Sequence, residues 1–343
     1  MARVWRAYDE TLARSVAVKF LFVREDRDGQ TTIDRFLREA RIAAAVRHPN
    51  VVDILDFGTS EGRPYMVMEL LEGESLEDRL QREPAMTLEE LLRAIAGALD
   101  GLAAVHRAGI VHRDLKPSNL FLLQTDDDSP PRPKLLDFGV SRDTDPGSGR
   151  RSALTTTDGY LVGTPEYMSP EQARGLSDID WRTDLYSVGV ILYEGLTGRL
   201  PFNAQAVGDL IIEIVGGGAP TVFEVREELG EALSNVVAQA MRIKREERFQ
   251  SAREMKDALL EAVDVSLGRG IRPSLPMPAP ERHLGASPSG SRRPPISSVS
   301  TLDGSALPWG AEAVPTFGAE PKRGSLETPH SWTLETKLPG GSS

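Results

Sequence analysis

Three polar residues whose side chains could handle a phosphoryl group lie within one short stretch of the chain. Asp114, Lys116 and Asn119 stand in His-Arg-Asp-Leu-Lys-Pro-Ser-Asn, residues 112–119, with an apolar strand-like run on either side. All three side chains can therefore project from one tight loop. A carboxylate can take the proton of an attacking hydroxyl, an ammonium can stabilise a transferring phosphoryl group, and a carboxamide oxygen can ligate Mg²⁺. The stretch predicts phosphoryl-transfer chemistry at this loop.

Composition limits the kinds of protein that could carry this loop. The chain has 343 residues and 40% hydrophobic content, which is enough for a sizeable core in a soluble globular protein. A net charge of −11 argues against general affinity for nucleic acid or for an anionic membrane surface. No cysteine is present, which excludes disulfides, a thiolate nucleophile and a Cys-based zinc site, and fits a cytoplasmic location. We expect no membrane span, because no apolar run approaches ~20 residues, and the N-terminus lacks a signal-peptide pattern.

The first 70 residues read as a small sheet with one helix. Four runs rich in β-branched, aromatic or other apolar residues predict strands at 1–9, 15–23, 51–57 and 64–70. Alternation in the second run would place Ala17 and Lys19 on one face and Val16, Val18 and Phe20 on the other. Apolar residues at helical spacing predict a helix over 31–47, ended by His-Pro-Asn at 48–50.

From residue 71 onward the periodicity is mainly helical. A capping-box pattern at 87–90 opens a long apolar helix that Gly109 should end, and a second apolar helix is predicted over 184–197. Between them lies a short strand ending in Asp137 and a polar loop over 140–170. The last helix should end near Val263. Half of the 24 prolines then fall beyond residue 272, so we predict a disordered Pro/Ser/Gly-rich tail over 265–343.

Several motifs, in order, resemble those of eukaryotic-type protein kinases, over residues 1–263. The loop 112–119 resembles the kinase catalytic loop H-R-D-L-x-x-x-N, and Lys-Leu-Leu-Asp-Phe-Gly at 134–139 resembles the Asp-Phe-Gly segment. Val-Ala-Val-Lys at 16–19 is similar to the kinase strand that carries a nucleotide-binding lysine, and 163–171 resembles the end of the activation segment. Lys116-Pro117 resembles the serine/threonine branch, and the sequences of 57–73 and 168–173 resemble those of bacterial Hanks-type kinases.

The resemblance implies an α+β, bilobal protein-kinase fold. Its N-lobe, 1–70, would be a small antiparallel β-sheet with one helix, and its C-lobe, 71–264, would be larger and mainly helical. ATP and Mg²⁺ are the implied cofactors, and the implied reaction moves the γ-phosphoryl group of ATP to Ser or Thr hydroxyls of proteins. No nucleic-acid partner is expected. A transient homodimer for phosphorylation between two copies is a further hypothesis.

The resemblance also assigns roles to individual residues. Asp114 would be the catalytic base, Lys116 would stabilise the γ-phosphoryl group, and Asn119 with Asp137 would hold Mg²⁺. Nucleotide contacts are implied for Val4, Ala17, Lys19 paired with Glu39, the gatekeeper Met68, Glu69, Leu71 and Asp137. Structural support is implied for His112, Arg113, Phe138, Gly139, Thr164, Glu171, Asp184 and Arg248. Arg113 could receive a phosphate, so phosphorylation is predicted at Thr155, Thr156 or Thr157.

The chain departs from the kinase pattern at its beginning. Kinases place a Gly-rich loop over the phosphates, but this chain starts inside that motif, with Ala2 at the third glycine position. The first strand and most of that loop are therefore missing from the sequence. We expect an internal start codon rather than a real truncation, because a sheet without its edge strand leaves apolar surface and backbone donors uncovered.

Two other functions compete with a protein kinase. A nucleotide-binding pseudokinase or scaffold would fit a genuine loss of the Gly-rich loop, although Lys19, Asp114, Asn119 and Asp137 argue against it. The second alternative function is that of a small-molecule phosphotransferase, such as an aminoglycoside kinase. Those enzymes generally lack the segment ending at Glu171 and its Arg248 partner, so this alternative ranks last.

Overall fold

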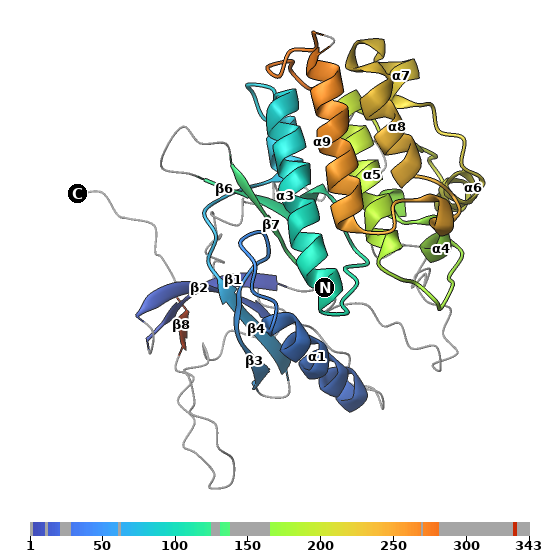
Figure 1. The fold of residues 1–343 in the computed structure, drawn as a ribbon. Coiled ribbons are helices and arrows are strands. Elements are labelled where there is room, and N and C mark those ends of the chain that lie inside the picture. Colours follow the sequence, from blue (N-terminus) through green and yellow to red (C-terminus); the bar gives the residue numbers. More distant parts are fainter. Residues whose placement is uncertain are drawn as a thin grey trace, which may run out of the picture. The chain divides into compact units, whose positions relative to one another are not determined.

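The computed structural model describes residues 3–10, 13–20, 29–60, 63–124, 131–137, 165–268, 270–280 and 332–334. The chain divides into two compact units (Figure 1). The first contains 1–44, 53–72 and 292–343, and the second contains 45–52 and 73–291. Each unit is described by itself below.

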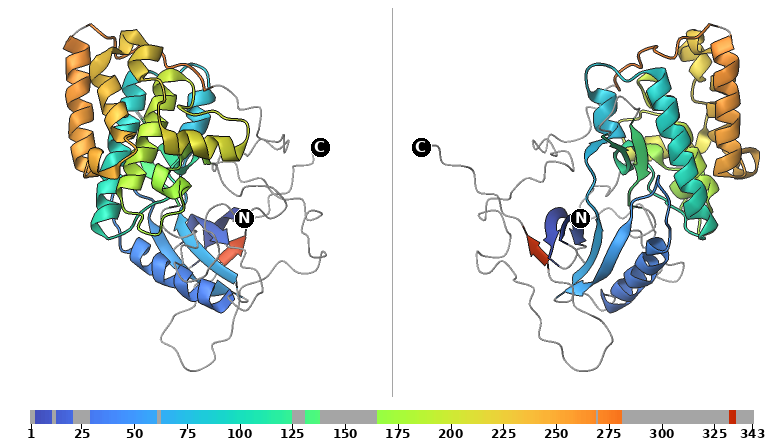
Figure 2. Two further views of the ribbon diagram at one scale, coloured as in Figure 1. Left: turned by 90° about the vertical axis from the view of Figure 1, so that its right-hand side faces the viewer. Right: turned by 60° about the vertical axis from the view of Figure 1, so that its left-hand side comes forward.

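The first unit is an antiparallel sheet with one helix. Its elements are β1 (Arg3–Asp9), β2 (Arg14–Phe20), α1 (Gly29–Ala44), β3 (Ile54–Ser60), β4 (Arg63–Glu69) and β8 (Trp332–Leu334). The sheet order is β3-β4-β2-β1-β8, and every neighbouring pair is antiparallel. The predicted small sheet with one helix is confirmed. The strand β8, drawn in red beside β1 in Figures 1 and 2, comes from the region predicted to be a disordered tail.

Alternation along β2 divides its residues between the two faces of this sheet. Val16 and Val18 form a buried cluster with Ala7 and Val67, and Phe20 packs against it. The predicted division of β2 into two faces is therefore confirmed, because Ala17 and Lys19 point the other way. On α1, which contacts β3 and β4, the residues Phe36, Ala40 and Ala43 are buried.

The second unit is mainly helical, as predicted. Its helices are α2 (Leu76–Gln81), α3 (Leu88–Arg107), α4 (Pro170–Ala173), α5 (Arg182–Thr197), α6 (Val207–Gly216), α7 (Val222–Val225), α8 (Gly230–Ala240) and α9 (Ala252–Gly268). A small antiparallel sheet joins β5 (Gly73–Ser75), β6 (Leu120–Leu123) and β7 (Arg132–Leu135). Short 3₁₀ turns lie at Pro117–Asn119, Pro165–Tyr167, Glu227–Leu229 and Arg245–Glu247. No helix in the described part of the chain is long and apolar enough to cross a bilayer.

Two buried helices form the frame of this unit. The Thr87 side chain caps α3 and forms the predicted capping box with Glu90. Beyond the end of α3, Gly109 adopts the left-handed conformation that favours glycine, as the sequence predicted. Within α3, an added Cβ on Gly101 would lie 2.6 Å from the carbonyl oxygen of Asn50, so this helix face requires a glycine. The helix α5 is buried along almost its whole length.

The predicted disordered tail begins too early. The last helix, α9, continues to Gly268, and the segment 270–280 runs back to the beginning of α3. The N–H groups of Leu88 and Glu89 donate to the carbonyls of Leu275 (2.8 Å) and Pro273 (3.0 Å). The first N–H groups of a helix lack acceptors inside the helix, and the carbonyls of this segment act as their acceptors. The prediction is therefore wrong for residues 265–268 and 270–280.

Candidate active site

The loop 112–119 is held in place by one buried carboxylate. Both oxygens of Asp184, which is fully buried in α5, accept hydrogen bonds from the loop backbone: Oδ2 from the N–H of His112 and Oδ1 from that of Arg113, each at 2.9 Å. The ring nitrogen Nε2 of His106 lies 2.8 Å from the same Oδ2. The sequence predicted that Asp184 braces the loop, and these contacts confirm it. The helix predicted over 184–197 begins earlier than expected, because α5 begins at Arg182 and its N-cap is Trp181.

The three residues that opened the sequence analysis are brought together by their own hydrogen bonds. The Lys116 Nζ donates to Asp114 Oδ2 at 3.1 Å, and the Asn119 Nδ2 donates to the Asp114 carbonyl at 2.7 Å. The Asp114 side chain is about a quarter exposed, so it is both held by neighbours and open to solvent. The amide of Asn119 is therefore oriented with its nitrogen toward the loop, which leaves its oxygen on the other side for a cation. The three residues thus lie together as predicted, and their catalytic and metal-binding roles stay predictions.

The second predicted Mg²⁺ ligand follows β7 directly. The N–H of Leu136 donates to the carbonyl of Asn119 at 2.9 Å. Asp137 is the next residue after Leu136, so it directly follows a residue that is bonded to Asn119. The backbone of Asp137 has a φ of 57°, a conformation that costs a non-glycine residue of order 1 kcal/mol and concentrates at functional sites. One carboxylate and one amide oxygen fit Mg²⁺, which commonly takes one or two protein ligands with substrate phosphates and water. No group of three or more His, Asp or Glu side chains that could hold a metal occurs in the described part of the chain.

His112 and Arg113 fix the backbone of the loop from the inside. The Nε2 of His112, which is 2% exposed, lies 2.8 Å from the carbonyl of Leu136. Arg113 has a φ of 64°, and its carbonyl accepts a 2.7 Å bond from the side chain of Gln172. The sequence analysis did not single out Gln172 or His106. His106 lies six residues before the loop and Gln172 follows Glu171 directly, so only their closeness to recognised motifs could have indicated them.

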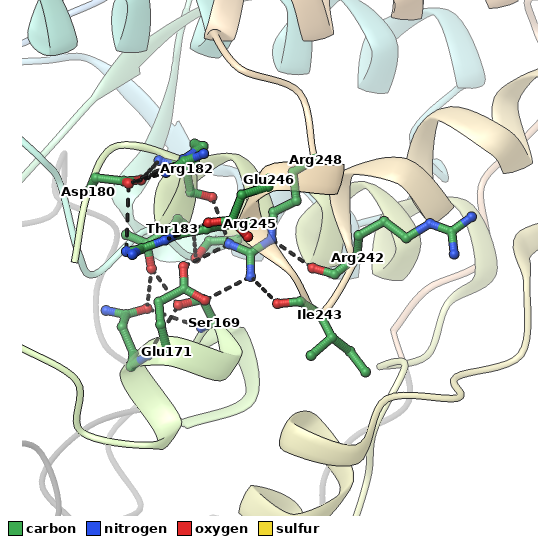
Figure 3. Close-up of polar contacts among 12 residues, drawn as sticks. Ser169, Glu171, Asp180, Arg182, Thr183, Arg242, Ile243, Arg245, Glu246 and Arg248 are labelled. Atoms are coloured by element: carbon green, nitrogen blue, oxygen red, sulfur yellow. Dashed lines mark hydrogen bonds and ion pairs between the residues drawn. The ribbon is translucent and has the colours of Figure 1, made fainter. Parts of the chain in front are cut away.

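A buried ion pair ties the end of the activation segment to the helical unit (Figure 3). Glu171 in α4 accepts two bonds of 2.7 Å from the guanidinium of Arg248, which also lies over the ring of Tyr186. Burial alone would raise the pKa of Glu171, but the hydrogen bonds and charge of Arg248 outweigh burial and lower that pKa. The predicted pair of Glu171 and Arg248 is therefore confirmed.

The same segment is anchored a second time, at a site that the sequence analysis missed. The hydroxyl of Tyr167 donates to Glu194 Oε2 at 2.6 Å, in the interior of α5. Burial is the largest influence on Glu194 and raises its pKa to about 7. The charges of Glu77 and Glu166 act in the same direction, while the bond from Tyr167 opposes them. Glu194 therefore titrates near neutral pH.

In the first unit, the pairing of neighbouring strands places four of the residues predicted to contact a nucleotide on one face of the sheet. Lys19 pairs with Val4 on one side and with Met66 on the other, and Ala17 pairs with Met68. Directly paired residues of neighbouring strands share a face. Val4, Ala17, Lys19 and Met68 thus lie together, on the face opposite the buried Val16–Val18 cluster.

The remaining predicted nucleotide residues lie in the same unit. Glu39 is half-buried in α1, and its pairing with Lys19 stays a prediction. The N–H of Glu69 donates to the carbonyl of Asp53 at 3.0 Å, so a base contact at Glu69 would have to use its carbonyl. Leu71 is buried. Phe138, Gly139, Thr155, Thr156, Thr157 and Thr164 lie outside the described residues, and their predicted roles stay predictions.

Comparison with known proteins shows the family of this chain. The protein kinase domain family matches residues 1–259, so the chain belongs to the protein kinase family. Relatives include the serine/threonine-protein kinases pkn2 and pkn3 of Myxococcus xanthus, which are 38% and 37% identical over 84% and 77% of this chain. The serine/threonine-protein kinase PknB of Mycobacterium tuberculosis is 37% identical over 76% of it. These alignments cover 34%, 48% and 40% of the relatives, so this chain spans at most about half of their length.

Proposed function

We propose that this chain is a serine/threonine protein kinase that transfers the γ-phosphoryl group of ATP to Ser or Thr hydroxyls of proteins. The observation that carries the proposal is the loop geometry, in which Lys116 and Asn119 are both bonded to Asp114 and the loop backbone is bonded to Asp184. A loop fixed in this way presents a carboxylate, an ammonium and an amide at constant spacing. Positioning of this kind, with electrostatic stabilisation, supplies nearly all of the rate in phosphoryl transfer.

Each residue then has one task. The carboxylate of Asp114 would orient the acceptor hydroxyl and take its proton, while Lys116 would stabilise negative charge on the transferring group. Lys19, on its face of the sheet, would contact the α and β phosphates, and Glu39 would hold it there. Asn119 and Asp137 would hold Mg²⁺, which when bound neutralises phosphate charge. The relatives, which are named as serine/threonine kinases, support the choice of acceptor.

Replacement of the catalytic carboxylate tests the proposal. We expect Asp114→Asn to lower transfer of labelled phosphate from ATP to a protein substrate by about 10²–10⁴-fold, because the hydroxyl loses its proton acceptor. Thermal unfolding should stay close to wild type, since the side chain is partly exposed. Asp100→Asn is the matched control: this carboxylate is 41% exposed, pairs with Lys256 on the helical surface, and should leave the rate unchanged.

Two results would contradict the assignment. A rate for Asp114→Asn within tenfold of wild type would show that this carboxylate is not the base. A wild-type chain that binds ATP but transfers no phosphate to itself or to any protein would instead indicate a nucleotide-binding scaffold. Analysis of the phosphorylated amino acids distinguishes Ser and Thr from Tyr acceptors.

Regulation through the segment 140–164 is part of the same proposal. We expect autophosphorylation at one or more of Thr155 to Thr157, with Arg113 as the receiving cation and a transient homodimer as the route. Mass spectrometry of the chain before and after incubation with ATP identifies the modified residue. Dependence of the initial rate on the square of protein concentration would support phosphorylation between two copies.

A further inference from the structure

The peptide unit that joins Arg113 to Asp114 is held on both of its sides. Its carbonyl, which belongs to Arg113, accepts a hydrogen bond of 2.7 Å from the Nε2 of Gln172. Its N–H, which belongs to Asp114, donates to the Nδ1 of His112 at 3.3 Å. The Nε2 of the same ring lies 2.8 Å from the carbonyl of Leu136. A carbonyl can only accept, so a neutral ring with its proton on Nε2 satisfies both contacts.

The carbonyl bond from Gln172 acts on a residue with an unfavourable backbone conformation. The φ of Arg113 is 64°, in the left-handed region, where a residue with a side chain stays only if its surroundings enforce it. The N–H of Arg113 is bonded to Asp184, and Gln172 provides the anchor at the carbonyl. If that anchor were removed, the peptide between Arg113 and Asp114 could turn. The Cα of Asp114 belongs to this peptide and would turn with it.

Gln172 is itself held by a buried network. Its Oε1 accepts from the backbone N–H of Ser169 and from the hydroxyl of Thr183, both at 3.1 Å. The hydroxyls of Ser169 and Thr183 are hydrogen-bonded to each other (Figure 3). Gln172 is 6% exposed, and the other two residues are fully buried. One end of the Gln172 side chain therefore accepts while the other donates, which a carboxamide can do and a carboxylate or a thioether cannot.

This network connects the loop 112–119 to two helices of the same unit. Gln172 belongs to α4, and Ser169 is the N-cap of that helix. Thr183 lies in the first turn of α5, and the next residue, Asp184, accepts the bond from the N–H of Arg113. Consecutive residues of α5 thus hold the two sides of Arg113, Asp184 directly and Thr183 through Gln172. The placement of α4 is coupled to the loop by this route.

We propose that Gln172 is a positioning residue for phosphoryl transfer, which fixes the peptide before Asp114 and makes the direction of the Asp114 carboxylate depend on the placement of α4. Gln172 acts through Asp114 and needs to touch neither the nucleotide nor the acceptor. The proposal rests on the proposed function, in which Asp114 is the base. A misplacement of about 1 Å can cost ~10²-fold in rate, so loss of an anchor beside the base should be visible in kcat.

Gln172→Glu tests this assignment with the smallest chemical change. The carboxylate keeps an acceptor for Ser169 and Thr183, but it brings a second acceptor, instead of a donor, to the carbonyl of Arg113. We expect kcat for phosphate transfer to a protein substrate to fall at least tenfold. KM for ATP should stay within twofold of wild type, because none of the residues hydrogen-bonded to Gln172 is predicted to contact the nucleotide.

Gln172→Met is a second variant, in case a buried carboxylate prevents folding. Methionine has a similar length, removes the donor and adds no charge, so we expect kcat to fall in the same direction. Thermal unfolding of each variant shows whether it is folded at the temperature of the assay.

Gln250→Glu is the matched control, because the amide of Gln250 also donates to backbone carbonyls. Its Nε2 lies 2.6 Å from the carbonyl of Arg248 and 3.2 Å from that of Glu246, in a turn without a proposed catalytic role. The same exchange of amide for carboxylate at this position should leave kcat unchanged.

Hydrogen exchange of the Asp114 amide provides a readout that does not require catalysis. In NMR spectra of the full chain, we expect this amide to exchange at least tenfold faster in Gln172→Glu and in Gln172→Met than in wild type. It should exchange at the wild-type rate in Gln250→Glu. The amides in the middle of α3 should be unchanged in all three variants, which excludes general unfolding.

The outcomes separate failure of this proposal from failure of the proposed function. A wild-type chain that transfers phosphate, together with Gln172 variants within threefold of its kcat, would overturn the positioning role alone. A fall in kcat without faster exchange of the Asp114 amide would also overturn it, because Gln172 would then act by another route. A wild-type chain that transfers no phosphate would refute the proposed function, and the catalytic role of Gln172 with it. A lower kcat at unchanged KM for ATP, with faster exchange at Asp114, would support the proposal.

Discussion

Arg248 offers the sharpest test of how the helical unit is held together. Arg248→Met removes a guanidinium that is 2% exposed and whose five N–H groups all have acceptors. Two of them bond to Glu171 at 2.7 Å, and the others bond to the carbonyls of Arg182 (3.1 Å), Arg242 (2.7 Å) and Ile243 (3.0 Å). Methionine fills much of the space but donates no hydrogen bond. The variant therefore leaves one buried carboxylate and three carbonyls without this donor.

The expected loss follows from that inventory. Removal of one partner of a buried ion pair costs about 3–5 kcal/mol, because the remaining charge stays buried. A typical domain is stable by only about 5–15 kcal/mol, so this loss should be easy to measure. In the wild type the pKa of Glu171 lies below its ordinary value of 4.5, and the stability that the pair contributes is present above pH 4.5 and lost below it.

In the variant, the contribution of Glu171 to the free energy of unfolding should change with pH in the opposite direction. Without Arg248, burial raises the pKa of Glu171, and the carboxyl takes up a proton as the pH falls. The difference in unfolding free energy between wild type and variant should therefore be largest at pH 7 and shrink as the pH falls through about 5.

Urea denaturation followed by circular dichroism at pH 7 and at pH 5 measures both effects. Arg253→Met is the matched control, because that side chain is 86% exposed and lies 3.9 Å from an exposed Asp257. We expect the control to change the unfolding free energy by less than about 0.5 kcal/mol. A loss below about 1 kcal/mol for Arg248→Met at pH 7, or a loss that does not shrink at pH 5, would refute this reasoning.

Two further predictions concern Glu194 and Gly101. Because the pKa of Glu194 is raised from 4.5 to about 7, this group makes stability fall between those pH values by roughly 3 kcal/mol. Glu194→Gln should abolish this fall in the free energy of unfolding, measured by denaturation at several pH values from 4.5 to 7.5. An unchanged fall with pH would exclude Glu194 as its source. Gly101→Ala should cost about 1–3 kcal/mol, because its Cβ meets the backbone of Asn50. Gly208→Ala in α6, where an added Cβ meets nothing within 4 Å, should instead stabilise by up to about 1 kcal/mol, and equal effects of the two changes would contradict the packing argument.

Local patterns in the sequence were enough to predict which polar residues meet in the loop 112–119. Asp114, Lys116 and Asn119 lie within six residues, so their meeting in one loop depends on little besides the loop itself. The faces of β2 followed from simple alternation, because a strand has a fixed period of two. In both cases the relevant geometry is local, and the sequence carries it directly.

Contacts between distant segments could not be predicted in this way. The bond from Gln172 to the Arg113 carbonyl and the contact of His106 with Asp184 join positions 59 and 78 residues apart. Such contacts depend on how helices pack, and no periodicity in the sequence records them. The kinase resemblance supplied the pairing of Glu171 with Arg248, which is 77 residues distant and equally invisible to local patterns.

Composition misled the prediction for the end of the chain. Proline and polar residues dominate after residue 265, and average composition of this kind indicates disorder. The segment 270–280 nonetheless packs through backbone groups, which every residue has, and through the buried side chain of Met277. Average composition cannot detect contacts of the main chain or a single buried side chain.

The course of the segment 270–280 has a practical consequence for fragments of this protein. An expression boundary chosen from sequence motifs would fall near residue 264, where the recognisable kinase resemblance ends. Such a fragment would lose the acceptors for the first amides of the long helix that leads to the catalytic loop, together with the bond from Met277 to the carbonyl of Met86. Crystallisation and screening fragments should therefore retain the chain through Pro280.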